Sequence, residues 1–258
     1  MDKLTTVDSS ASYAPVNKES DGTTEPGFPT IRISPELGVP DYLEQTYWWA
    51  YLHPKGVRFF ERQWLVNLIL WGNYSRLRDA ALTEAKERAS GRTLQVACVY
   101  GDFTPLLGQC LGRDGRLDVV DVAPVQLKNL SCKIQGSRNI FLNHQDSTQL
   151  EFEDGTFDQV VLFFLLHEQP TAARVKSISE ALRVTRPGGK IIFVDYHRPK
   201  GTSPFRYLMV PILKSLEPFA MDVWNHEITE WVPDGVELQS VDKVTYFGGL
   251  YQKVVMIR

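Results

Sequence analysis

Five short apolar segments, separated by stretches of helical character, constrain the fold of this chain more than any other feature. In chain order they are Thr93–Tyr100, Leu117–Val122, Asn139–Asn143, Phe157–Leu166 and Lys190–Asp195. Phe157–Leu166 is almost uniformly apolar, as expected for a strand that is buried on both faces. Strands that alternate with helices imply right-handed crossovers, so the sequence predicts an α/β fold with a parallel, doubly wound sheet.

The last two predicted strands, Leu238–Phe247 and Leu250–Ile257, differ from the others because only Gly248 and Gly249 separate them. So short a glycine connection predicts a tight antiparallel hairpin. A C-terminal hairpin on an otherwise parallel sheet is typical of class I methyltransferases that use S-adenosylmethionine, and not of dinucleotide-dependent dehydrogenases. We therefore expect a Rossmann-like class I methyltransferase sheet, mostly parallel, with a C-terminal antiparallel hairpin.

Composition divides the 258 residues into three parts. Residues 1–40 are rich in Ser, Thr, Gly, Pro and charge, which predicts a disordered or loosely docked arm. Residues 41–90 are dense in aromatic side chains at helical spacing, which indicates an N-terminal helical lid. Residues 91–258 contain the α/β domain. The length suits one such domain and is short for two.

Charge and cysteine content argue against several classes of protein. The net charge is −3, so nothing indicates binding to nucleic acid. The three cysteines are scattered without a CxxC pair, which argues against a disulfide framework or a zinc site. No apolar run reaches the ~18–20 residues that span a bilayer, and the first residues lack the apolar core of a signal peptide. We therefore expect a cytoplasmic protein, which lies on the membrane surface if it meets a membrane.

Candidate cofactor residues follow the predicted strands, since ligands of such sheets bind at the carboxyl ends of the strands. After the first strand, methyltransferases usually have several glycines, whereas this chain has Gly101 followed by Asp102. Asp102 could accept a hydrogen bond from the ammonium group of S-adenosylmethionine. The alternative is an ordinary turn between a strand and a helix.

Asp121 ends the second strand and precedes Val122, at the place where an acid can hold both ribose hydroxyls. Its alternative role is that of an acid near the N-terminus of the next helix. Asp146 and Ser147 follow the third strand, where an acid can meet the adenine amino group. A helix cap or a turn is the alternative there. Phe164, near the end of the fourth strand, completes the residues that we assign to the cofactor.

Two histidines follow the fourth and fifth strands, which are neighbours in the predicted sheet. His167 precedes Glu168, and His197 follows the fifth strand. Imidazole nitrogen and carboxylate oxygen together can hold a divalent cation such as Mn²⁺ or Mg²⁺, or they can serve as acid and base. We expect these three residues to be catalytic and to be candidate metal ligands, with Tyr100 as a further catalytic candidate. The alternatives are a helix cap for His167 and packing beneath a loop for His197.

The aromatic side chains of Tyr42–Trp71 and the apolar stretch Phe205–Trp224 exceed what is needed to cover the sheet. They indicate either a well-packed helical lid or a tunnel and membrane-facing surface for a long apolar substrate. Arginines at positions 58, 62, 76 and 78 lie between these residues and would suit anionic lipid headgroups.

Several longer segments resemble a known family. EALRVTRPGGKIIFVDYHRP, DSTQLEFEDGTFDQVV and LLHEQ are similar to the ubiquinone/menaquinone biosynthesis methyltransferases. Five more resemble the rhodoquinone biosynthesis proteins, a divergent branch of that family: YWWAYLHPKGVRFFERQWLVNLILWGNYSRLRDAAL, VACVYGDFT, VVDVAPVQLKNL, FFLLHEQP and YFGGLYQKVV. The resemblance runs from about Pro40 to the C-terminus.

This resemblance implies the conversion of ubiquinone to rhodoquinone, in which an amino group replaces a ring methoxy group. It implies S-adenosylmethionine as the amino donor, manganese as a second cofactor, and ubiquinone as a lipid substrate taken by an enzyme bound peripherally to the inner membrane. His167 and Glu168 are similar to the Glu/His cluster that holds a metal in quinone O-methyltransferases. A metal on the neighbouring carbonyl would make the ring carbon that carries methoxy more electrophilic.

Two alternatives stay open. The first is a conventional quinone C- or O-methyltransferase of the same fold. The second is a non-catalytic quinone-binding subunit, which the single glycine after the first strand favours. The acids Asp121 and Asp146 and the pair His167-Glu168 disfavour this second alternative.

Overall fold

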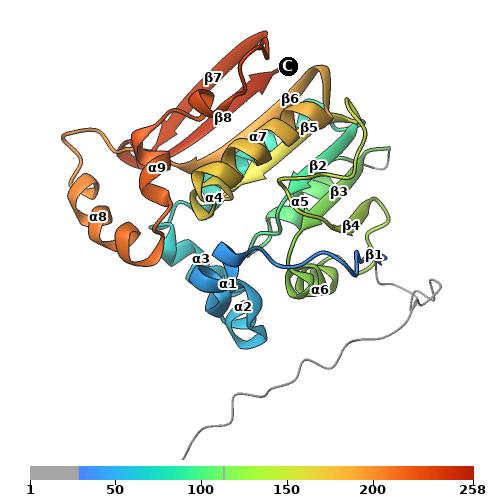
Figure 1. Cartoon of the computed structure of the whole chain (residues 1–258), viewed down its shortest axis with the longest axis horizontal. Helices are drawn as coiled ribbons and strands as arrows, with labels where there is room; N and C mark the ends of the chain where they lie inside the picture. The colour runs from blue at the N-terminus through green and yellow to red at the C-terminus, as the bar shows by residue number, and fades with distance from the viewer. Residues whose placement is uncertain (1–28, 113) are drawn as a thin grey trace, which may run out of the picture.

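The computed structural model describes residues 29–112 and 114–258, and these residues form an eight-stranded sheet (Figure 1). The strands are β1 (Ile31–Arg32), β2 (Arg92–Val96), β3 (Arg116–Asp121), β4 (Ile140–His144), β5 (Phe157–Phe163), β6 (Thr185–Tyr196), β7 (Ser240–Tyr246) and β8 (Tyr251–Ile257). Their order is β1-β4-β3-β2-β5-β6-β8-β7. Strands β1 to β6 pair in parallel, and β8 lies antiparallel between β6 and β7. The predicted parallel sheet with a C-terminal antiparallel hairpin is confirmed.

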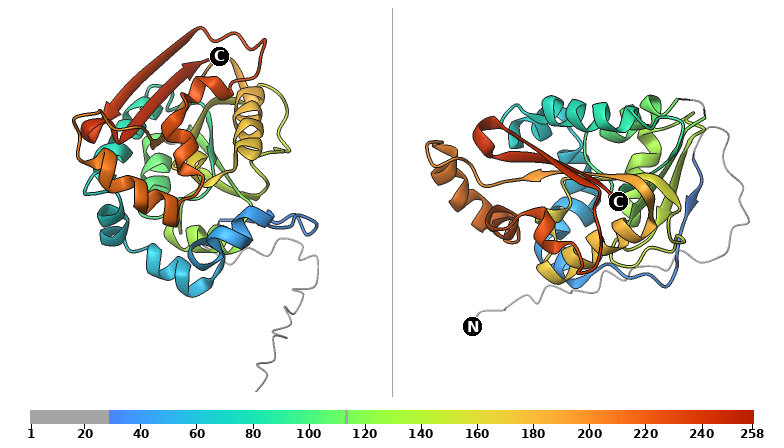
Figure 2. Two further views of the ribbon diagram at one scale, coloured as in Figure 1. Left: turned by 60° about the vertical axis from the view of Figure 1, so that its left-hand side comes forward. Right: turned by 90° about the horizontal axis from the view of Figure 1, so that it is seen from above.

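Helices cover both faces of the sheet, so the domain has three layers (Figure 2). The first face is covered by α4 (Tyr74–Lys86), α5 (Phe103–Cys110) and α6 (Pro124–Lys133). The second face is covered by α7 (Thr171–Val184) and the 3₁₀ turn Ile228–Trp231. The covered faces explain why the central strands are apolar on both sides.

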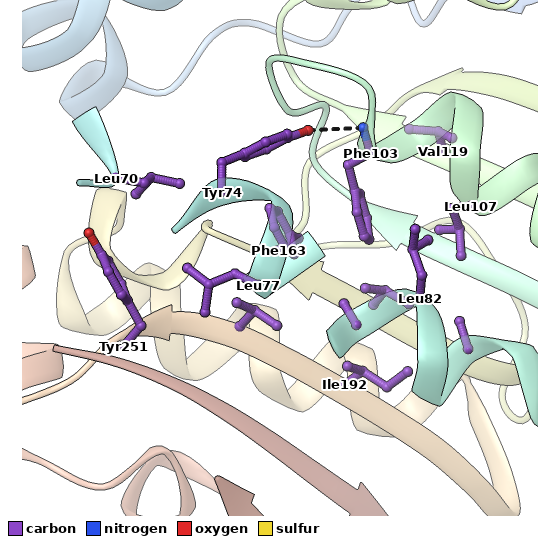
Figure 3. Close-up of a cluster of buried hydrophobic side chains, with 14 of the residues drawn as sticks. Leu70, Tyr74, Leu77, Leu82, Phe103, Leu107, Val119, Phe163, Ile192 and Tyr251 are labelled. Atoms are coloured by element: carbon purple, nitrogen blue, oxygen red, sulfur yellow. Dashed lines mark hydrogen bonds between the residues drawn. The ribbon is translucent and has the colours of Figure 1, made fainter. Parts of the chain in front are cut away.

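The core on the first face is organised around α4 (Figure 3). Tyr74 and Leu77 point from this helix toward Phe103 of α5 and Phe163 of β5. The rings of Phe103 and Phe163 stack with their centroids 4.3 Å apart. Both rings are almost fully buried, and each large aromatic side chain contributes on the order of 2–3 kcal/mol through its removal from water.

The first predicted strand is shorter than expected, and this difference creates room for the site. Thr93–Tyr100 was expected to be extended, but β2 ends at Val96. Ala97 takes a left-handed backbone conformation with φ of 69°, which turns the chain away from the sheet. Cys98, Val99 and Tyr100 therefore lie in a loop at the carboxyl end of β2.

The predicted helical lid consists of α1 (Asp41–Tyr47), a π-helical turn (Trp48–Leu52), α2 (Pro54–Phe60) and α3 (Gln63–Ile69). Figure 1 shows these helices near the end of the sheet where the parallel strands finish, together with α8 (Phe205–Leu216) and α9 (Ala220–Asn225). The expected boundary at residue 90 is too late, because α4 packs against the sheet: Leu77 and Ala81 are fully buried. Among the described residues, no helix is both long and apolar enough to cross a membrane.

The predicted arm, residues 1–40, falls partly outside the described residues, which begin at residue 29. Its last part is docked, since Ile31 and Arg32 pair with Leu142 and Asn143 at the edge of the sheet. The ring of His144 lies 3.1 Å from the carbonyl oxygen of Ser34 and thereby holds the chain that follows β1.

We predict that Gly56→Ala destabilises the lid. A Cβ atom at Gly56 would lie 1.8 Å from the carbonyl oxygen of Trp49, so α2 would have to move away from the π-helical turn. Overpacking of this kind costs about 1–3 kcal/mol, which should exceed the gain in helix propensity. Chemical denaturation measures the free energy of unfolding. Gly38→Ala is the control, because no atom lies within 4 Å of its Cβ position. Equal stability of the two variants would contradict the prediction.

Candidate functional site

Two contiguous cavities lie at the carboxyl ends of the parallel strands. The polar cavity has a volume of about 580 Å³, and its polar lining residues are Asp121, Gln126, Gln145, Asp146, Ser147 and Gln169. The aromatic cavity has a volume of about 820 Å³, and it is lined by the lid and by the ends of β2, β5 and β6. Tyr51, Cys98 and Glu168 line both cavities. The two cavities are therefore neighbours that share part of their wall.

Asp121 lies in the polar cavity, as does Val122. Its Oδ2 atom accepts a hydrogen bond of 2.7 Å from the backbone of Cys98, and its Oδ1 atom accepts one of 2.8 Å from Ala123. Burial raises the pKa of Asp121 to about 6, and these backbone donors oppose the rise. The carboxylate is ionised at neutral pH, and each oxygen keeps a lone pair for a further donor.

Asp146 and Ser147 also line the polar cavity. Oδ1 of Asp146 accepts a hydrogen bond of 2.8 Å from the backbone of Thr148, so this acid forms a turn as well as lining the cavity. The hydroxyl of Ser147 lies 2.8 Å from the hydroxyl of Ser177 and accepts a hydrogen bond from Gln169. The structure thus brings together Asp121, Val122, Asp146 and Ser147.

Gly101 and Asp102 do not join these residues, and our expectation for them is corrected. Neither lines the polar or the aromatic cavity. The carboxylate of Asp102 forms an ion pair with Arg78 at 2.8 Å and accepts a hydrogen bond from Tyr74. The backbone N–H of Gly101 donates to Glu61. Asp102 therefore already has a positively charged partner, Arg78, and does not need the ammonium group of a cofactor as its partner.

Tyr74 explains why a glycine is required at position 101. Its hydroxyl accepts hydrogen bonds of 3.0 and 3.1 Å from the backbone N–H groups of Asp102 and Phe103 (Figure 3 draws the second). These groups lie at the N-terminus of α5, where backbone donors would otherwise need a partner. Gly101 has φ of +84°, and a Cβ atom there would lie 2.6 Å from the Tyr74 hydroxyl. The glycine accommodates a side chain of the protein itself.

His167 is held by Asp195, which ends the fifth predicted strand two residues before His197. Nδ1 of His167 lies 2.9 Å from Oδ1 of Asp195, and both side chains are almost fully buried. Oδ2 of Asp195 accepts further hydrogen bonds from the backbone of Leu166 and His167. Burial lowers the pKa of His167, but the charge and hydrogen bond of Asp195 outweigh it and raise the pKa to about 9. His167 is therefore an imidazolium at neutral pH, with Nε2 directed toward Glu168 at 3.8 Å.

Glu168 lies where the two cavities meet. Burial raises its pKa to about 8, while the neighbouring His167 lowers it. The hydroxyl of Tyr51 donates a hydrogen bond to Oε1 of Glu168. Because Tyr51 belongs to the π-helical turn, this bond connects the lid to the end of β5. His167 and Glu168 are thus brought together as predicted.

Glu217 is a further acid of the aromatic cavity that sequence analysis missed. It follows directly after α8, and burial raises its pKa. A signal was present, since Glu217 is the only acid within the apolar stretch from Phe205 to Phe219. Tyr42, from α1, is a second missed residue and lines the polar cavity.

His197 does not join His167 and Glu168, which corrects the expected set of metal ligands. Its Nδ1 lies 2.7 Å from the carbonyl oxygen of Gly249, and its Nε2 lies 3.0 Å from Nζ of Lys243. The hairpin connection therefore holds the ring away from both cavities. Within residues 29–112 and 114–258, no group of three or more His, Cys, Asp or Glu side chains is arranged to hold a metal ion.

Tyr100 and Phe164 both line the aromatic cavity. The ring of Tyr100 stacks on Tyr51 with 5.6 Å between centroids, and Gln126 donates a hydrogen bond of 2.9 Å to its hydroxyl. Tyr100 also bonds the carbonyl oxygen of Ala50 at 2.5 Å, so it fixes the lid to the domain. Phe164 has φ of 56° and packs edge-to-face against His167, which orients the imidazole.

Comparison with known proteins identifies relatives of this chain. Residues 93–189 match the model of a methyltransferase domain family. The chain is 30% identical over 186 residues to the demethylmenaquinone methyltransferase of Staphylococcus saprophyticus subsp. saprophyticus, a match that covers 68% of this chain and 78% of the relative. It is 28% identical over 135 residues to the demethylmenaquinone methyltransferase of Staphylococcus aureus strain JH9, covering 52% of this chain and 55% of the relative.

Solved structures share the fold. A SAM-dependent methyltransferase from Aquifex aeolicus superposes with a TM-score of 0.50 at 18% identity, covering 80% of this chain and 98% of that chain. The PH0226 protein from Pyrococcus horikoshii OT3 superposes with a TM-score of 0.53 at 20% identity, and the match covers 85% of this chain and 99% of that chain. The sheet is thus that of the class I methyltransferases. Together with the identity to the staphylococcal enzymes, it establishes that the chain belongs to the quinone-related family of S-adenosylmethionine-dependent methyltransferases that includes demethylmenaquinone methyltransferase.

Proposed function

We propose that this chain transfers a methyl group from S-adenosylmethionine to the ring of a reduced quinone in the aromatic cavity. The observation that carries the proposal is the His167–Asp195 pair, which faces an aromatic cavity contiguous with the polar cavity. A cavity with an apolar lining and a few convergent polar groups suits a flat ring with hydroxyl substituents. The names of the staphylococcal relatives support a quinone precursor as the substrate.

The polar cavity fits the adenosine part of the cofactor. Asp121 keeps lone pairs for two ribose hydroxyls, and Asp146 with Ser147 lies at the place expected for the adenine ring. When bound, S-adenosylmethionine supplies an electrophilic methyl group on a positively charged sulfur. Cys98 lines both cavities, so it is a candidate to contact the part of the cofactor nearest the substrate.

His167 would act as the general base. In its neutral form, Nε2 accepts the proton of a ring hydroxyl, and Asp195 stabilises the imidazolium that results. The ring carbon would then take the methyl group from the cofactor sulfur, which would keep the electron pair. His167 would return its proton to the ring oxygen and, now neutral, would accept the ring hydrogen as a proton, which restores the aromatic quinol. The imidazolium would pass this one net proton to solvent. The raised pKa of His167, about 9, brings it close to that of a phenolic hydroxyl, which is ~10.

The exchange of a methoxy group for an amino group, which converts ubiquinone to rhodoquinone, is a second candidate. The loop after β2 favours it, because Val99 and Tyr100 stand where methyltransferases usually have glycines, and Gly101 accommodates Tyr74. In that reaction, an amine adds to the ring carbon and the methoxy group leaves as methanol after it takes up a proton. The His167 imidazolium could donate this proton. The resemblance that suggests this exchange also implies manganese, for which His167 and Glu168 are the paired candidate ligands. If Nε2 of His167 held the metal, His167 could not be the proton donor, because its Nδ1 bonds Asp195.

We also propose that the lid docks on a lipid bilayer, from which a long-tailed quinone would enter. Seven large apolar side chains are at least 39% exposed on or beside the lid helices and form what we term the lid patch: Trp48, Trp49, Phe59, Trp64, Leu68, Ile69 and Trp71. Trp49 and Ile69 of this patch also line the aromatic cavity. Exposed cations on α2 and next to it, Lys55, Arg58 and Arg62, would face anionic headgroups.

The product of the purified chain separates the two reactions. We expect incubation with S-adenosylmethionine and a demethylated quinol to give a product heavier by one CH₂ unit. With ubiquinone instead, replacement of OCH₃ by NH₂ would give a lighter, nitrogen-containing product. Mass spectrometry of the extracted quinones measures both, and parallel assays with and without a chelator test the metal. A nitrogen-containing product from ubiquinone, with no methylation, would overturn the methyl-transfer proposal in favour of the second candidate.

The rate should rise with pH. A general base must be neutral, so kcat/KM is expected to increase as the pH approaches the His167 pKa of about 9. His167→Gln should lower the rate by about 10²–10⁴-fold and remove this pH dependence. Asp195→Asn removes the charge that raises the His167 pKa, so it should move the rise in rate to lower pH. Retention of the wild-type pH profile in His167→Gln would show that another group is the base.

Membrane docking is measured by sedimentation with vesicles of phosphatidylglycerol. We expect Trp64→Gln with Leu68→Gln to reduce binding by roughly tenfold or more, since each apolar side chain contributes about 1.5–3 kcal/mol when it leaves water. Val241→Gln is the matched control, because Val241 is 45% exposed on β7 and lies outside the lid patch. If the double variant and the control bind equally, the lid patch does not dock on the bilayer.

A further inference from the structure

The loop after β2 is occupied by the protein's own side chains, which limits where the amino-acid end of the cofactor can lie. The hydroxyl of Tyr74 accepts from the first backbone donors of α5, and Asp102 is paired with Arg78. Nζ of Lys133 donates to Glu61 and to the carbonyl oxygen of Gly101 at 2.9 Å in each case. The charged and polar groups on this side of the loop thus have partners.

The aromatic cavity, by contrast, presents a pair of polar groups with no partner beyond each other. Oε2 of Glu217 and the hydroxyl of Tyr47 are buried there, make no hydrogen bond of good geometry among the described residues, and lie close enough together for each to affect the pKa of the other. Tyr47 is only 1% exposed, and its hydroxyl is close enough to Glu217 for the carboxylate to raise its pKa. A buried polar atom without a partner costs free energy, so a ligand group that satisfies it binds favourably.

The acids of the cavity suit a cation. Glu168 and Glu217 both line it, and burial raises the pKa of each, that of Glu168 to about 8. A cation beside Glu217 would favour the ionised form of this acid. The imidazolium of His167 is already compensated by Asp195, with which it pairs at 2.9 Å.

We infer that Glu217, with Tyr47 and Glu168 beside it, holds the ammonium group of the cofactor's amino-acid end. S-Adenosylmethionine then extends from the polar cavity past Cys98 into the aromatic cavity, and its ammonium donates to the carboxylate of Glu217. This arrangement replaces the role that Asp102 was expected to have. It concerns cofactor binding alone and holds whichever quinone reaction the chain catalyses.

The test compares three ligands by isothermal titration calorimetry. S-Adenosylhomocysteine carries the ammonium, its deamino analogue lacks only that group, and 5′-methylthioadenosine lacks the whole amino-acid end. Wild-type protein should bind S-adenosylhomocysteine about 10- to 100-fold more tightly than the deamino analogue, as expected for a charge-assisted hydrogen bond. Glu217→Gln should abolish this preference and leave the affinity for 5′-methylthioadenosine unchanged.

Two control variants separate this result from general damage. Asp121→Ala should weaken all three ligands alike, because all three carry the ribose. Asp118→Asn changes an acid of the same strand that pairs with Arg92 and Arg116 outside both cavities, and it should leave all three affinities unchanged. The inference is overturned if wild-type protein binds S-adenosylhomocysteine and the deamino analogue equally, or if Glu217→Gln retains the preference. If Glu217→Gln fails to fold, the wild-type comparison alone can still overturn the inference. The binding test does not depend on catalysis, so its result stands even if the chain catalyses neither of the two proposed quinone reactions.

Discussion

The buried carboxylate of Asp195 is the group on which the geometry of the site depends. It lies at the end of β6, is 1% exposed, and accepts hydrogen bonds from the His167 ring and from the backbone of Leu166, His167 and Tyr196. A buried charge is stable only when such donors surround it. Leu166 and His167 belong to the 3₁₀ turn Leu166–Glu168. Their hydrogen bonds to Asp195 therefore fix the path of the chain after β5. The same bonds fix the direction of the imidazole.

Arg174 holds this turn from the other side. Its guanidinium is fully buried and donates to the carbonyl oxygens of Leu166 and Gln169 at 2.8 and 2.7 Å. It also lies over the ring of Trp231, with 4.5 Å from its central carbon to the ring centroid. A planar guanidinium can make several directed bonds at once, which a lysine could not. The turn that carries His167 and Glu168 is therefore restrained by the negative charge of Asp195 and by the positive charge of Arg174.

The lid is attached to this turn through aromatic side chains. Tyr51 stacks on Tyr100, bonds Glu168 and lines both the polar and the aromatic cavity. Tyr100 can reach the lid because the loop after β2 carries side chains where glycines are usual. The methyltransferase domain match ends at residue 189, and the lid and Glu217 lie outside it. Both cavities are therefore lined by residues from the matched part and by residues outside it.

The sequence by itself determined the order of strands and helices, because burial on both faces and the period of the apolar residues are local properties of the chain. It also placed Asp121, Asp146 and His167 at strand ends, since the fold class fixes which ends share one edge of the sheet. Only the tertiary structure decided the partners of these groups. Asp102 pairs with Arg78 and His197 with the Gly249 carbonyl, and the residues concerned are 24 and 52 positions apart in the chain. Glu217 meets Tyr47 in the aromatic cavity for the same reason: hydrogen bonds and ion pairs depend on ångström-scale distances between distant segments, which apolar periodicity does not encode.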